Sequence, residues 1–65
     1  MTRYRVTFRY GAPRALYEVL DVEADELRTA MRLAADRVPD EVAATAELVE
    51  VRVQREADDR AYTEG

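Results

Sequence analysis

The side chains that could do chemistry in this 65-residue chain are of few kinds. The chain has no Cys, His, Lys or Ser, which excludes thiol and serine nucleophiles, imidazole acid–base catalysis and lysine Schiff bases. Its only glycines are Gly11 and Gly65, so it has no glycine-rich phosphate loop. Only carboxylates, arginines, threonines and tyrosines remain as reactive groups.

Neighbouring carboxylates occur at three places: Asp25-Glu26, Asp40-Glu41 and Asp58-Asp59. A helix cap explains the first pair, a turn the second and an acidic tail the third. Their spacing matches no known calcium or magnesium loop. We therefore expect no catalytic residues, no metal site, no cofactor and no small-molecule substrate. The sequence predicts a protein that is not an enzyme.

Arginine is concentrated at the start of the chain. Residues 1–14 carry a net charge of +4 and residues 15–65 a net charge of −8, which gives −4 overall. Arg3, Arg5 and Arg9 alternate with apolar residues, so on a strand they would share one face and could contact the phosphates of a nucleic acid. The acidic total argues against this, because nucleic-acid-binding domains are usually basic. Nucleic-acid binding through these three arginines is the alternative function.

The arginines belong to residues 3–10, which alternate strictly between polar and apolar side chains and predict a half-buried β-strand. One face carries the arginines and Thr7. The other is apolar and mostly aromatic, and we expect it to lie under a helix. Its members are Tyr4, Val6, Phe8 and Tyr10.

A second strand is predicted at 15–22, after a turn that contains Gly11 and Pro13. If residues 11–14 form the loop, Phe8 lies opposite Tyr17, and a loop one residue shorter exchanges the two faces of the strand. In either register two sizeable apolar side chains point away from the helix. In the first register the residues on that outer face are Leu16, Glu18 and Leu20.

A helix is predicted from Asp25, which could cap it, to Val38, which precedes Pro39. Its apolar stripe comprises Leu27, Ala30, Met31, Ala34 and Val38. A third strand is predicted at 46–55, with alternating valines at 49, 51 and 53. Residues 57–65 are acidic and aperiodic, and we expect a flexible tail.

The order strand, strand, helix, strand predicts a small α+β domain over residues 1–56. Because a helical crossover returns the third strand parallel to the second, the simplest sheet is three-stranded and antiparallel, in order 2-1-3, with the first strand central and the helix on one face. On the open face we expect the arginines to pair with Glu18 and Glu50.

The second strand would be an edge with apolar side chains on both faces and no Lys or internal Pro to prevent pairing. We therefore predict a small non-catalytic protein-interaction module, a homodimer or a binder of another protein, that associates through residues 15–22. Leu16, Glu18 and Leu20 are its candidate contact residues. In the alternative, residues 42–45 cover this edge in a monomer. With no Cys, no export signal and no membrane-spanning run, the expected location is the cytoplasm.

Overall fold

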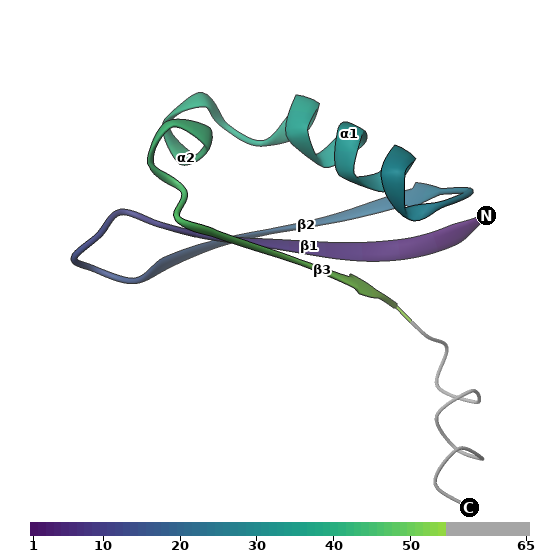
Figure 1. Ribbon diagram of the computed structural model, residues 1–65, viewed down its shortest axis with the longest axis horizontal. Coiled ribbons are helices and arrows are strands. Elements are labelled where there is room, and N and C mark those ends of the chain that lie inside the picture. The colour runs from purple at the N-terminus through teal and green to yellow at the C-terminus, as the bar shows by residue number, and fades with distance from the viewer. Residues whose placement is uncertain (55–65) are drawn as a thin grey trace, which may run out of the picture.

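The central strand of the sheet is β1 (Thr2–Tyr10), with β2 (Leu16–Ala24) and β3 (Leu48–Val53) on either side of it. This computed structural model describes residues 1–54. Both outer strands run antiparallel to β1, which confirms the predicted order 2-1-3 and the α+β class. Figure 1 shows the helices as a second layer on one face of the sheet. The predicted tail at 57–65 lies outside the described residues.

The helical layer consists of α1 (Leu27–Arg37) and the short α2 (Asp40–Thr45). Val38 is extended before Pro39, so α1 ends where the sequence predicts. The predicted cap is wrong, because Glu26 occupies the N-cap position and makes no side-chain capping hydrogen bond. Residues 40–45, expected as a turn and an ambiguous segment, form α2, whose Val42 is buried.

The register of the hairpin settles which faces of β2 point inward. Phe8 lies opposite Glu18 and Val6 opposite Leu20, and the loop of residues 11–15 includes Gly11 with a φ of 77°. The loop is one residue longer than the loop that would pair Phe8 with Tyr17, so that pairing does not occur, and the faces of β2 are those expected for the alternative register. Four side chains of β2 therefore lie on the open face of the sheet: Tyr17, Val19, Asp21 and Glu23.

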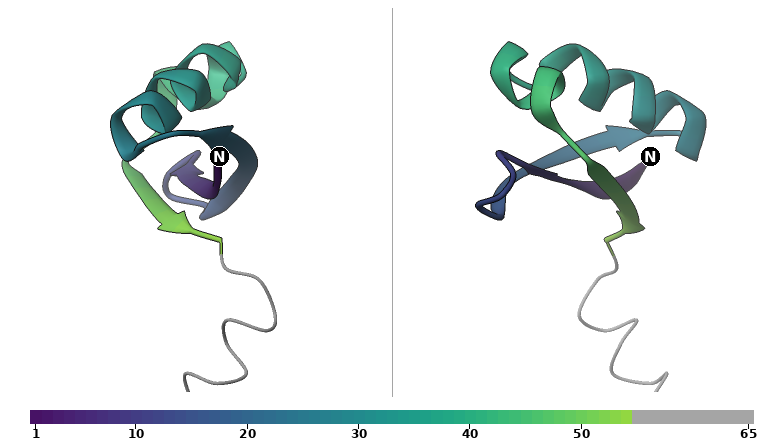
Figure 2. Two further views of the ribbon diagram at one scale, coloured as in Figure 1. Left: turned by 90° about the vertical axis from the view of Figure 1, so that its right-hand side faces the viewer. Right: turned by 60° about the vertical axis from the view of Figure 1, so that its left-hand side comes forward.

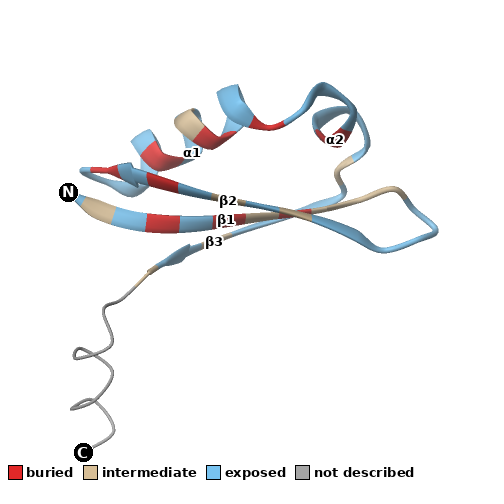
Figure 3. Cartoon of the chain, turned by 180° about the vertical axis from the view of Figure 1, so that it is seen from behind, coloured by how far each residue is buried: buried red, intermediate tan, exposed pale blue. Residues whose placement is uncertain are grey.

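The core lies between the helices and the β1–β2 half of the sheet (Figure 3). Buried side chains come from every element except β3: Tyr4, Val6, Phe8, Val22, Ala24, Ala30, Ala34, Val38 and Val42. α1 packs mainly on β2 and α2 packs on β1, whereas β3 slopes away from the helical layer (Figure 2). The helix therefore covers the sheet off-centre.

This placement corrects the expected helix stripe. Ala30 and Ala34 are fully buried, but Leu27 and Met31 are 49% and 47% exposed. The small alanines let α1 lie close to β2, and Met31 lies on the side of α1 that faces Val49 and Val51 of β3. Val49 and Val53, expected in the core, are likewise about half exposed.

Candidate functional site

The open face of the sheet carries a ladder of ion pairs along β1. Arg5 donates two hydrogen bonds to Asp21, from Nε to Oδ1 at 3.0 Å and from a terminal nitrogen to Oδ2 at 3.3 Å. Arg3 pairs with Glu23 at 3.3 Å, and Arg9 with Glu47 at 3.1 Å. The hydrogen bonds from Arg5 lower the pKa of Asp21, and Asp21 raises the pKa of Arg5. All three β1 arginines on this face thus contact carboxylates of the same chain.

The expectation that β1 arginines are neutralised internally is confirmed, but both predicted partners are wrong. Glu18 lies opposite Phe8 on the helix side of the sheet, because the register exchanges the faces of β2. Glu50 lies opposite Thr7 and pairs with Arg52 of its own strand at 3.2 Å. Nucleic-acid binding through Arg3, Arg5 and Arg9 would have to compete with these contacts.

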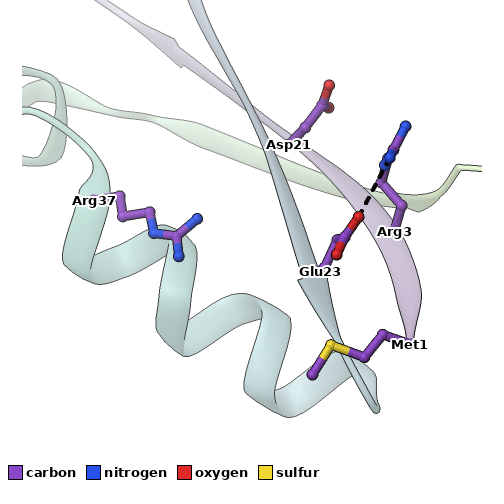
Figure 4. A pocket seen from close by; sticks show the side chains of 5 residues that line it. All are labelled: Met1, Arg3, Asp21, Glu23 and Arg37. Atoms are coloured by element: carbon purple, nitrogen blue, oxygen red, sulfur yellow. Dashed lines mark hydrogen bonds and ion pairs between the residues drawn. The ribbon is translucent and has the colours of Figure 1, made fainter.

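A polar hollow of about 520 Å³ lies at the β2 edge of the sheet (Figure 4). Arg37 reaches toward it from the end of α1, and the Arg3–Glu23 ion pair forms part of its wall. Asp21 and the exposed Met1 complete the lining. Two arginine side chains and two carboxylate side chains line the same space, so the side-chain charges of the hollow balance.

An apolar groove of about 380 Å³ lies on the helix side of the sheet, between α1 and β3. Side chains of β1 form its floor, α1 forms one wall and β3 the other. The wall residues Met31 and Val49 are 47% and 53% exposed. The lining residues are Val6, Phe8, Met31, Ala34, Ala35, Val49 and Val51.

The groove opens beside the outer edge of β3. Within residues 1–54 no strand pairs with this edge, and β3 carries neither Lys nor Pro, the residues that commonly prevent edge pairing. Leu48 on the open face of the strand is 48% exposed, and Val49 and Val53 on the helix side are exposed to a similar degree. The groove and the helix-side valines of this edge together form one apolar surface, which we call the β3 surface: Met31, Ala35, Val49, Val51 and Val53.

The predicted contact residues of β2 lie on the helix side of the sheet and not on its open face. Leu20 packs against the core and Glu18 is partly buried, so only Leu16, at 38% exposure, is largely accessible. The prediction that two apolar side chains of β2 point away from the helix is confirmed, but they are Tyr17 and Val19, at 58% and 49% exposure. Residues 42–45 lie in α2, over the face of β1, and the outer edge of β2 is unpaired in the described residues.

Sequence reasoning missed the β3 surface. Alternating valines are typical of a buried strand, and nothing in their spacing indicates how far across the sheet a helix reaches. The one available signal was the pair of small residues Ala30 and Ala34, which fit a close helix–sheet contact and leave Met31 to one side.

The described residues contain no cluster of three or more carboxylates that could hold a metal ion. No helix among them is long and apolar enough to cross a membrane. Comparison with protein-family models, with curated proteins and with solved structures finds no match to this chain.

Proposed function

We propose that this chain is a small, non-catalytic protein-interaction module of the cytoplasm that self-associates. The observation that carries this proposal is the β3 surface, an apolar groove that continues into a strand edge with which no strand of residues 1–54 pairs. Exposed apolar surface of this kind, next to an open edge, is typical of a binding site that adds a strand from another chain.

The size of the chain supports the same function. A domain of about 60 residues buries only about 60% of the surface that its unfolded chain exposes, and a core below 70–80 residues rarely supplies more than about 3–5 kcal/mol. The chain has no disulfide with which to compensate. Association that covers β3 would add the missing apolar contacts.

Sequence reasoning assigned the contact to residues 15–22, and the β2 edge remains the alternative within this function. Leu20, Val22 and Ala24 of β2 lie in or against the core, whereas of β3 only Val51 packs against it. Leu16, Tyr17 and Val19 of β2 are exposed, to about the same degree as the outer residues of β3. The charged residues of β2 are all acidic: Glu18, Asp21 and Glu23. In a pairing of two β2 strands no cation of one strand would lie opposite the carboxylates of the other, so we favour β3.

Two valines provide a matched test, because Val19 of β2 and Val53 of β3 are each 49% exposed. We expect light scattering to show a dimer for the natural chain and for Val19→Asp, and a monomer for Val53→Asp. Replacement of a contact residue that costs about 2 kcal/mol of binding free energy weakens association by roughly 30-fold, and we expect an effect of this size for Val53→Asp.

The reverse result, with Val19→Asp or Leu16→Glu monomeric and Val53→Asp dimeric, would move the contact to β2. Leu20 is unsuitable for this test because it packs against the core. A monomer at every concentration would refute self-association. Salt-sensitive binding of DNA or RNA would instead favour the arginine face.

A further inference from the structure

We infer, on the basis of the proposed self-association, that the partner of the β3 surface is a second copy of this chain, paired antiparallel through β3 about a two-fold axis at Val51. The axis runs perpendicular to the sheet and makes one six-stranded sheet from two copies. The β1–β3 ladder, the faces of β3 and the positions of its charges determine this register.

The backbone of β3 presents unused hydrogen-bonding groups at alternate residues. Gln54 donates its N–H to the carbonyl oxygen of Arg3 at 2.7 Å, which places position 54 among the hydrogen-bonded pairs of the β1–β3 ladder. Because such pairs alternate along an antiparallel ladder, residues 48, 50 and 52 also direct their backbone groups to β1. Val49, Val51 and Val53 therefore direct theirs to the outer edge, where a second β3 could receive them.

Symmetry restricts the possible registers. A two-fold axis perpendicular to the sheet keeps the open face of both copies on the same side. Residues that lie opposite one another must therefore point to the same face, so the axis lies midway between one residue of β3 and the same residue of the second copy. An axis at Glu50 would set this carboxylate opposite its own copy, and an axis at Arg52 would do the same for the guanidinium. Like charges directly opposite one another are destabilising.

An axis at Val51 removes this conflict. It sets Glu50 of each copy opposite Arg52 of the other, on the open face of the sheet. The existing Glu50–Arg52 pair of 3.2 Å within each strand then becomes part of a group of four alternating charges. Of the three registers with the axis at Glu50, Val51 or Arg52, only the one at Val51 places opposite charges of the two β3 strands against each other.

The same axis joins apolar residues on the helix side. Val49 lies opposite Val53 of the second copy, and the two Val51 side chains meet at the axis. Cross-strand pairs of β-branched residues are stabilising contacts, and here they would cover valines that are about half exposed in one chain. The two grooves would merge into one trough, with Met31 of each copy at its borders.

Disulfide trapping tests the register, because the chain has no Cys and each introduced thiol is therefore unique. Residues of a hydrogen-bonded antiparallel pair lie about 5.5 Å apart between Cα atoms, within the range that a disulfide bridges. Under a glutathione redox buffer we expect Val51→Cys to shift from monomer to dimer on a non-reducing gel. Val49→Cys should not link to itself, but should link to Val53→Cys in a mixture.

Each alternative has its own result. Linkage of Val49→Cys with Val51→Cys would place the axis at Glu50, and linkage of Val51→Cys with Val53→Cys would place it at Arg52. Either would overturn this register, as would the absence of all linkage in a chain that light scattering shows to be dimeric. A chain that is monomeric in light scattering would refute the proposed self-association itself.

Charge exchange provides a second, independent test. Glu50→Arg replaces two attractive contacts in the dimer by two repulsive ones, and association should weaken by about tenfold. Adding Arg52→Glu to the same chain should restore it, because the exchanged charges again oppose their complements. Failure of the double variant to recover, with its fold intact by circular dichroism, would contradict the register.

Discussion

β2 and β3 are the two outer strands of one sheet, and both are rich in apolar residues, yet they differ in burial. β2 buries Val22 and Ala24 beneath α1, whereas the most enclosed side chain of β3, Val51, is only partly buried. The difference follows from the position of α1, which packs on β2 and leaves β3 uncovered. Composition thus indicates which strands can be buried, and the position of a single helix decides which are.

The largest expected effect separates the two strands by their tolerance of a charge. Val22→Asp places an unpaired carboxylate at a position that is 2% exposed, and the cost of several kcal/mol should unfold the chain. Val49→Asp, at a 53% exposed position, should change the free energy of unfolding of the monomer by no more than about 1 kcal/mol. Circular dichroism and urea titration measure both. Unfolding by both substitutions would mean that β3 is core already in the monomer.

A second comparison concerns two neighbouring alanines of α1 that both line the groove but differ in exposure. Ala34 is 1% exposed against the core, so Ala34→Leu should overpack it and destabilise by roughly 1–3 kcal/mol. Ala35 is exposed and lines the groove, so Ala35→Leu should cover part of Val49 and Val51 and stabilise the monomer by about 1 kcal/mol.

Urea titration in a Val53→Asp background would keep association from contributing to the measurement on the alanine variants. Equal changes in the free energy of unfolding for Ala34→Leu and Ala35→Leu would show that the buried and the exposed position of α1 accommodate a larger side chain equally well.

The smallest expected effect lies on the open face. The pKa of Asp21 is lowered by Arg5, so its contribution to stability is present above the ordinary aspartate pKa and is lost as the pH falls through the lowered value. Arg5→Gln should raise the pKa of Asp21, followed by NMR of the carboxyl carbon. The control Arg52→Gln, on β3, should leave it unchanged. An unchanged pKa in Arg5→Gln would mean that the bidentate contact is absent in solution.

Much of the fold could be predicted from the alternation of polar and apolar residues and from the order of the strands and the helix. Strict alternation in residues 3–10 defines the two faces of β1, and the order of elements restricts the sheet to 2-1-3. The hairpin register could not be predicted, because it depends on whether Ala15 joins the loop or the strand. The prediction for Glu18 was wrong for the same reason, because one step of register moves Glu18 inward and brings Asp21 opposite Arg5. Glu50 lies on the expected face but pairs with Arg52 of its own strand, which the alternation does not indicate.

The candidate site could not be predicted, because it arises from the rotation and position of α1. Leu27 and Met31 satisfy the helical period as well as Ala30 and Ala34 do. Only the packed structure shows that Ala30 and Ala34 are buried, whereas Met31 lines the groove beside β3. A wide apolar stripe does not specify which part of it faces the sheet.

The uncovered groove also has a consequence for gene dosage. If a second copy closes the groove, the β3 surface of a newly made chain stays exposed until the chain meets another copy, and during that time proteases and chaperones compete for the chain. At low expression most chains would be cleared before they pair, and at high expression most would survive. The steady-state amount of the protein would then rise more steeply than its rate of synthesis.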